Sequence, residues 1–275
     1  MRVDANPNNF PPLAPSLRQP RPSLWERIKK ALVPIGVLGL VLLKWLKLLI
    51  LPVLKFLPFL LKTGGTMFIT MWVYAMTWGW WFAVGFVLLI FVHECGHLIA
   101  AKRLGLKVGV PVFIPFMGAL IALKDAPRNA WIEAQVGIGG PLLGSLGALV
   151  CLGLAPLTGN PLFQGLAYTG FFLNLFNLAP IGFLDGGRIV TALSPWLWLV
   201  GTVVIGFLLI THFSFLLLLI FVFSLPRLFS LFRKRTAEEE RYYEVTPQQR
   251  WTMGALYFGL IVALVLGMKL ILFQP

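Results

Sequence analysis

The chain has 275 residues, of which 58% are hydrophobic and 12% are charged, and its mean hydropathy is +0.85. A soluble globular domain carries about twice this share of charged residues, about 25%, so the composition excludes a soluble globular enzyme. The length suits one compact membrane domain with several spans. We attribute the net charge of +13 to Lys and Arg in cytoplasmic loops, and we expect no nucleic-acid partner.

The N-terminal part of the chain divides into two segments. Residues 1–23 hold Asn and Pro but no apolar run, so we predict a disordered tail and not a cleavable signal peptide. Residues 24–62 are apolar but contain six lysines, which form one narrow stripe when they are plotted at about 100° per residue. This pattern predicts an amphipathic helix lying in the membrane interface. A transmembrane hairpin with snorkelling lysines is the alternative.

The remaining residues, 64–273, are predicted to form one membrane-embedded domain. Its apolar runs predict spans at 64–78, 80–104, 130–155, 161–179, 195–211, 213–231 and 251–272. Between the second and third spans, residues 107–125 are rich in Val, Ile and Phe and are broken by Pro and Gly, which predicts short strands. Such strands can lie at membrane depth only where protein or a wet cavity surrounds them. A charged cytoplasmic linker, 233–250, is predicted before the last helix.

The distribution of basic residues orients this layout. With a cytoplasmic N-terminus, 22 of the 23 Lys and Arg fall in the N-terminal segment and in three inner loops, and the exception is Lys269. This asymmetry follows the positive-inside rule. We therefore predict an all-α, multi-pass integral membrane protein with about seven transmembrane helices, a short reentrant β-loop and an interfacial N-terminal helix. We place it in a bacterial plasma membrane.

The second predicted span carries a cluster of ionisable residues. His93 and His97 are four residues apart, so they share one helix face and both imidazoles can reach one metal ion. Glu94 lies close to the midline between them, near enough to hold a metal-bound water. This is the H-E-x-x-H arrangement of a zinc pair with an adjacent general base. An ionisable cluster in an apolar helix is energetically expensive, so it indicates a functional site.

A third protein ligand has to be a carboxylate or a Cys, because the remaining histidine, His212, falls at a predicted outer turn. Outside the solvated segments, the acidic candidates are Asp125, Glu133 and Asp185. Asp185 follows the fourth span, after Pro180 ends a helix and before Gly186 and Gly187, which permit close backbone approach. This would turn Asp185 back toward the second span. The alternative is that Asp185 caps the next short helix, and the spacing leaves both readings open.

Two motifs together resemble a known family. The sequence HECGH, followed about 80 residues later by NLAPIGFLDGG, resembles the site-2 proteases of peptidase family M50, whose pattern is H-E-x-x-H and then N-x-x-P-x-x-x-L-D-G. The resemblance covers the core from about 80 to 190. Gly140-Pro141 is similar to the Gly-Pro of the family's intervening span, but Gly144 stands where the family often has Asn. The segment 107–125 is similar to the family's reentrant β-loop.

The resemblance assigns roles to residues of this chain. The residues implied to bind one zinc ion per chain are His93, His97 and Asp185. Glu94 would be the general base, and Asn177 would contact the substrate or help to hold the oxyanion. We assign Gly118, within the reentrant segment, to substrate binding. For Asn174 we expect only a role in helix packing.

The function that the resemblance implies is regulated intramembrane proteolysis. A zinc metalloprotease in the bilayer would hydrolyse peptide bonds in the transmembrane segments of other proteins, with an exposed strand edge within 110–123 holding the unwound substrate. One alternative is a non-proteolytic membrane metalloprotein that binds client membrane proteins, against which the intact Glu94 argues. Another is a transporter with His93, Glu94 and Asp185 as an ion relay, against which the nearly apolar outer halves of the spans argue.

Overall fold

The computed structural model describes residues 63–115, 118–123 and 126–272, together with Trp25, Leu32 and Lys44. The chain divides into two units, Met1–Leu57 and Pro58–Pro275, and every element given below belongs to the second. The predicted tail and nearly all of the predicted interfacial segment lie outside the described residues, so both stay predictions.

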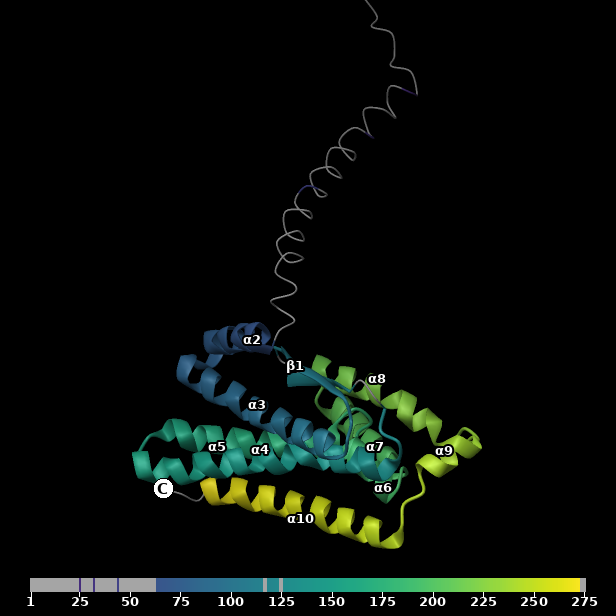
Figure 1. The fold of residues 1–275 in the computed structure, drawn as a ribbon. Coiled ribbons are helices and arrows are strands. Elements are labelled where there is room, and N and C mark those ends of the chain that lie inside the picture. The colour runs from purple at the N-terminus through teal and green to yellow at the C-terminus, as the bar shows by residue number, and fades with distance from the viewer. Residues whose placement is uncertain are drawn as a thin grey trace, which may run out of the picture. The chain divides into compact units, whose positions relative to one another are not determined.

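The described part of the second unit is mostly helical, with one small antiparallel sheet (Figure 1). Its elements are α2 (Thr63–Trp78), α3 (Trp80–Arg103), β1 (Val108–Ile114), β2 (Gly118–Leu123), α4 (Ala130–Thr158), α5 (Pro161–Asn177), α6 (Asp185–Leu193), α7 (Leu197–Thr211), α8 (Phe215–Ser230), α9 (Ala237–Tyr242) and α10 (Pro247–Leu272). Of the described helices, α3, α4 and α10 are long and apolar enough to cross a membrane. The count of seven spans stays a prediction. The predicted linker before the last helix contains α9 and the first turn of α10.

The helix ends follow local sequence signals. Gly79, with φ +80°, separates α2 from α3, in a backbone region that residues with a Cβ rarely adopt. Asn129 caps α4 by accepting a hydrogen bond from the backbone N–H of Ile132. At the other end of α4, Gly159 adopts the left-handed conformation, and Asn160 caps α5. The predicted breaks between these helices are confirmed.

The strands predicted within residues 107–125 are present as β1 and β2. β1 and β2 pair antiparallel, with Ile114 opposite Gly118 and Phe113 opposite Ala119. The hairpin is attached to α2, because the backbone N–H of Phe113 donates to Thr66 Oγ1 over 3.1 Å. The Phe113 side chain is buried in a cluster that includes Tyr74 of α2 and residues of α3. The hairpin therefore lies against α2 and α3, next to the helix that carries the H-E-x-x-H motif.

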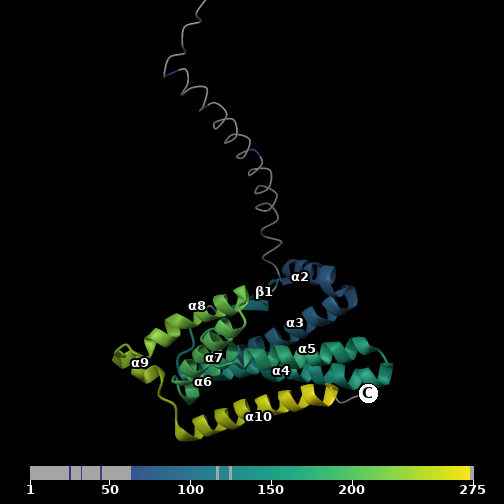
Figure 2. The same ribbon diagram turned by 180° about the vertical axis from the view of Figure 1, so that it is seen from behind.

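The centre of the unit is a stack of close-packed helices, in which α10 runs beside α4 and α5 (Figure 2). α3 and α4 touch backbone to backbone, because a Cβ at Gly96 would collide with the carbonyl oxygen of Gly139. Further along, a Cβ at Gly147 would meet Leu89, so the two helices are antiparallel. Small residues at such contacts are typical of helices that pack in membranes, and they bring α3 close to the elements that follow.

Candidate metal centre

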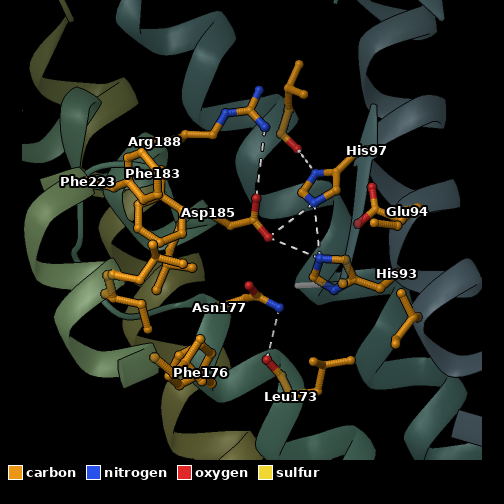
Figure 3. A pocket seen from close by; sticks show the side chains of 18 of the residues that line it. His93, Glu94, His97, Leu173, Phe176, Asn177, Phe183, Asp185, Arg188 and Phe223 are labelled. Carbon is orange, nitrogen blue, oxygen red and sulfur yellow. Dashed lines mark hydrogen bonds and ion pairs between the residues drawn. The ribbon is translucent and has the colours of Figure 1, made fainter. Parts of the chain in front are cut away.

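Three side chains from α3 and α6 converge on one point. The Nε2 atoms of His93 and His97 each lie 3.1 Å from Asp185 Oδ2, and they lie 3.1 Å from each other. All three residues are buried, and Figure 3 shows their polar atoms facing one another. Within the described ranges, this is the one group of three His, Cys, Asp or Glu residues that could hold a metal ion.

The fold delivers Asp185 to this point through a tight turn. α6 packs so closely on the preceding turn that a Cβ at Gly186 would collide with the carbonyl oxygens of Leu178 and Ala179. The N-cap position of α6 is Leu184, and Asp185 is the first helical residue. The capping alternative for Asp185 therefore does not hold. Its Oδ2 faces the histidines, and its Oδ1 lies 3.9 Å from Arg188 Nη1.

The outer nitrogens of both imidazoles are held by hydrogen bonds. His97 Nδ1 donates to the carbonyl oxygen of Val136 over 2.8 Å. His93 Nδ1 lies 2.8 Å from Asn174 Oδ1. The Asn174 amide donates through Nδ2 to the carbonyl oxygen of Gly170 over 2.7 Å, which directs its acceptor oxygen toward His93. Both histidines are therefore Nδ1–H donors, and in a neutral imidazole this leaves Nε2 as an acceptor.

The chemistry of this donor set fits zinc. Two imidazole nitrogens and one carboxylate oxygen, all acceptors, face one another at 3.1 Å, and such a group repels itself unless a cation lies between its members. Tetrahedral zinc, with bonds of about 2.0–2.2 Å, places neighbouring ligand atoms about 3.3–3.5 Å apart. The measured separations are within a few tenths of an ångström of that range. Two His and one carboxylate are also a ligand set of catalytic zinc sites, which keep a fourth position open.

Asn174 is the residue of this site that sequence reasoning missed. It was expected only to pack, yet it is 1% exposed and its amide is fully engaged between His93 and Gly170. Gly144 of α4 makes room for it, because a Cβ there would collide with Asn174 Oδ1. The sequence held a signal, since a buried amide on an apolar helix needs hydrogen-bond partners. Gly144 was a second signal for Asn174, because the family often has Asn at position 144 and a glycine there leaves room for a side chain from another helix.

A cavity of about 560 Å³ lies beside the three convergent side chains. Glu94, itself buried, lines it together with His93, His97 and Asp185. Most of the remaining wall is apolar, and its large side chains include Tyr74, Phe86, Phe176, Phe183 and Phe223. The polar groups are therefore gathered at one part of an otherwise apolar cavity.

The two residues predicted to bind substrate line the same cavity. Asn177 ends α5, and its side-chain amide donates to the carbonyl oxygen of Leu173 over 3.1 Å (Figure 3). Gly118 begins β2 with φ +90°, and its neighbour Ala119 also lines the cavity. The fold thus brings the start of β2 and the end of α5 to the site, although these segments are far apart in the sequence.

Of the other candidates for a third ligand, the two that the structure describes are not at this point. Glu133 accepts hydrogen bonds from Arg227 Nη2 over 2.7 Å and from the Tyr242 hydroxyl over 2.6 Å. Asp125 lies outside the described residues. His212 is exposed at the end of α7.

Comparison with known proteins gives several matches. A model of the family described as peptidase family M50 matches residues 81–161. The zinc metalloprotease MJ0392 of Methanocaldococcus jannaschii is 33% identical over 119 residues, which cover 40% of this chain and 34% of that protein. The protein named probable zinc metalloprotease EGY2, chloroplastic, of Arabidopsis thaliana is 31% identical over 153 residues, covering 40% of this chain and 27% of that protein. The protein of the same name from Oryza sativa subsp. indica is 31% identical over 149 residues, covering 38% and 27%.

The chain spans between about a quarter and a third of the length of the curated relatives it matches. The matched family region contains His93, Glu94 and His97 but ends before Asp185, whose place in the site is given by the geometry above. The relatives are named as zinc metalloproteases, and His93, His97 and Asp185 of this chain form a group that could hold a metal ion. The H-E-x-x-H motif of α3 and the Gly-Pro of α4 both lie inside residues 81–161, the region that is similar to peptidase family M50.

Proposed function

We propose that the chain is an intramembrane zinc metalloprotease that hydrolyses peptide bonds within the transmembrane segments of other membrane proteins. The single observation that carries this proposal is the convergence of three acceptor atoms next to the buried Glu94, in a cavity between apolar helices. A buried carboxylate that is not one of the converging groups has a clear use as a base beside a metal. It has none in a protein that only binds clients.

The proposed chemistry divides between the metal and the chain. When bound by His93, His97 and Asp185, zinc supplies a Lewis acid that polarises the scissile carbonyl and lowers the pKa of a water toward 7. The Glu94 carboxylate accepts the proton of the attacking water and later gives it to the leaving amine. Asn177, at the cavity wall, is proposed to hydrogen-bond the substrate carbonyl.

The same network that favours zinc binding keeps the two histidines in the productive tautomer. Asn174 and the Val136 carbonyl each hold an Nδ1–H, so that both Nε2 atoms stay available as ligands. Such outer hydrogen bonds orient metal ligands and raise their basicity. The positions of these two acceptors are set by the packing of α4 and α5 on α3.

The apolar cavity indicates the class of substrate. Its aromatic wall suits the apolar side chains of a transmembrane segment, which has to unwind before its peptide bonds can be attacked. β2 pairs with β1 on one edge, and Gly118 and Ala119 lie at the cavity. We propose that the unwound segment adds to the free edge of this hairpin by main-chain hydrogen bonds. Single proline substitutions through 119–123 that leave cleavage at the parental rate would exclude this step.

The first experiment measures zinc per chain in the purified, detergent-solubilised protein. We expect about one zinc per chain in the parent protein, retention in Glu94→Gln and loss in Asp185→Ala, because only the second change removes a ligand. A reconstituted assay with an apolar transmembrane substrate then follows. Cleavage by the parent protein and none by Glu94→Gln supports a protease. Absence of zinc from parent protein prepared without chelators removes the proposal.

A further inference from the structure

A second hollow of the molecule lies on the opposite side of the α3–α4 contact from the metal centre. We call it the α10 groove, and its volume is about 540 Å³. It is formed by α3, α4 and α10, and its floor includes Gly96 and Gly139, the two glycines at which α3 and α4 touch. It shares no lining residue with the cavity at the metal centre. The proposed proteolytic chemistry therefore does not account for it.

The α10 groove is apolar along most of its length and polar at one end. Ile99, Leu142, Leu146 and Leu256 line it and are each more than a third exposed. Because α3 and α4 are antiparallel, the last turn of α3 and the first turn of α4 lie at the same end. That end carries Arg103 and Trp131, and Thr252 comes from the first turns of α10.

Among the described residues that line the groove, Arg103 has the one charged side chain. It is exposed, and it has no ion-pair partner within the described parts of the chain. An arginine of this kind at the end of an apolar helix is complementary to a phosphate group, which the guanidinium binds in a bidentate manner. Trp131 beside it is typical of the level of the lipid head groups.

The length of the groove matches one leaflet of a bilayer. From Trp131 to Leu146 along α4 it extends about 22 Å at 1.5 Å per residue. Half of a bilayer that is about 40–45 Å thick, head groups included, is about 20–22 Å.

We propose that the α10 groove binds one phospholipid with an anionic head group, whose phosphate contacts Arg103 and whose acyl chain lies along Ile99, Leu142 and Leu146. This proposal does not depend on the proposed proteolytic activity. The floor of the groove is the contact between α3 and α4, so a lipid bound there supports the packing of these two helices. His97 lies close to the same contact, since a Cβ at Gly140 of α4 would collide with its ring.

Native mass spectrometry of the full chain tests the proposal. The protein is purified in a mild detergent, stripped of lipid and titrated with phosphatidylglycerol or phosphatidylcholine of the same acyl composition. We expect the first phosphatidylglycerol to bind more tightly than phosphatidylcholine. Arg103→Gln should weaken phosphatidylglycerol binding by about 5- to 10-fold, because one contact between a basic side chain and an anionic head group is lost.

The matched control for the charge is Lys102→Gln. It removes the same charge one residue earlier in α3, from an exposed side chain that does not line the groove. Phosphatidylglycerol binding close to that of the parent protein in Lys102→Gln supports a contact specific to Arg103. Equal losses in the two variants would mean that general surface charge attracts the lipid, and the site proposed here would be wrong.

A second pair of variants tests the acyl part of the groove. Leu142→Trp places a large side chain in it and should weaken the binding of both lipids. Leu149→Trp adds the same ring two turns further along α4, at a residue that is 49% exposed and lies outside the groove, and should leave binding unchanged. If Leu142→Trp leaves lipid binding intact but alters the oligomeric state by light scattering, the groove binds a second copy and not a lipid, which overturns the proposal.

Discussion

Asp185 and Glu133 are both buried carboxylates in the first turn of a helix, α6 and α4 respectively, but the groups around them differ in kind. Glu133 is surrounded by donors: the Arg227 guanidinium on one oxygen and the Tyr242 hydroxyl on the other. The oxygen of Asp185 that faces the cavity meets two imidazole nitrogens that carry no proton, because each ring holds its proton on Nδ1.

This difference distinguishes a structural ion pair from a metal centre in a chain where both are buried. The Glu133 cluster carries its own cation, and Arg227 also lies 5.2 Å above the Trp198 ring, so its charges are balanced by the protein. The cluster at Asp185 is short of one cation at the point where its acceptors meet. The comparison predicts that changes at the first cluster alter the stability of the fold, and that changes at the second alter metal binding and activity.

The largest expected effect is on activity at Glu94. Glu94→Gln removes the proposed base but none of the three converging ligands, so cleavage of a transmembrane substrate should fall by about 10²- to 10⁴-fold. Zinc content, measured by atomic absorption on the same preparation, should stay at the parental value. A variant that retained parental cleavage would assign the base to another residue of the cavity.

The next effect concerns Asn174, which the comparison places with the metal cluster. Asn174→Leu removes the acceptor of His93 Nδ1 and should weaken zinc binding by about 10- to 100-fold, the usual effect of losing an outer hydrogen bond to a metal ligand. Competition with a fluorescent chelator measures the affinity directly. Asn174→Asp keeps an acceptor oxygen and should restore much of it, which mere loss of packing would not allow.

The matched control for Asn174 lies on the same helix. Asn177→Leu removes an amide three residues later, which donates a hydrogen bond to a backbone carbonyl and not to a histidine. It should leave the zinc affinity unchanged, whatever it does to cleavage. Equal losses of affinity in Asn174→Leu and Asn177→Leu would show that the end of α5 matters as a whole and that the bond to His93 does not.

Features that neighbouring residues determine could be predicted from the sequence, whereas features that depend on contacts between distant residues could not. The break at Gly79 and the start of α5 at Pro161 are local features, and there prediction and structure agree, whereas α4 continues to Thr158, three residues beyond its predicted end. The bounds of the short helices α6 and α9 could not be predicted, because nine and six residues are too few to show a periodic apolar pattern. Short strands were predictable from their Val, Ile and Phe, but their antiparallel register and their packing on α2 and α3 were not.

The candidate site divides in the same way. The spacing of His93 and His97 predicts a shared helix face, because four residues make about one helical turn. The spacing could not separate ligand from cap for Asp185, since that depends on how α6 folds back after α5. Asn174 was missed because its partner His93 is 81 residues away in the sequence. A residue that acts through a distant contact gives a weak local signal, here only an amide in an apolar helix.

The third prediction concerns the Glu133 cluster. Glu133→Gln leaves Arg227 without its carboxylate, and we expect a loss of about 1–3 kcal/mol in the free energy of unfolding. This lies below the 3–5 kcal/mol of a fully buried pair, because the Arg227 side chain is 33% exposed and solvent screens it. Unfolding in mixed micelles with increasing SDS measures the change. Loss of zinc from folded Glu133→Gln protein would contradict the separation of the two clusters.

The smallest expected effect is at Tyr242, the second donor to Glu133. Tyr242→Phe removes one hydrogen bond to a charged acceptor, and we expect a loss of about 1–2 kcal/mol in the free energy of unfolding, measured in the same micelles. Burial and the Glu133 carboxylate raise the pKa of the Tyr242 hydroxyl far above its usual value, so the folded state favours the protonated form.

The pH dependence of that difference gives a sharper test. Because the pKa of Tyr242 is higher in the folded than in the unfolded state, its contribution is fully present below the unfolded pKa of about 10 and is lost as pH rises above that value. The stability difference between the parent protein and Tyr242→Phe should therefore be constant from neutral pH to about pH 9.5. Above pH 10 it should fall by about 1.4 kcal/mol per pH unit. A difference that stays constant to pH 11 would mean that Tyr242 does not hold its proton against Glu133, and the cluster would then lack one of the two donors that set it apart from the metal centre.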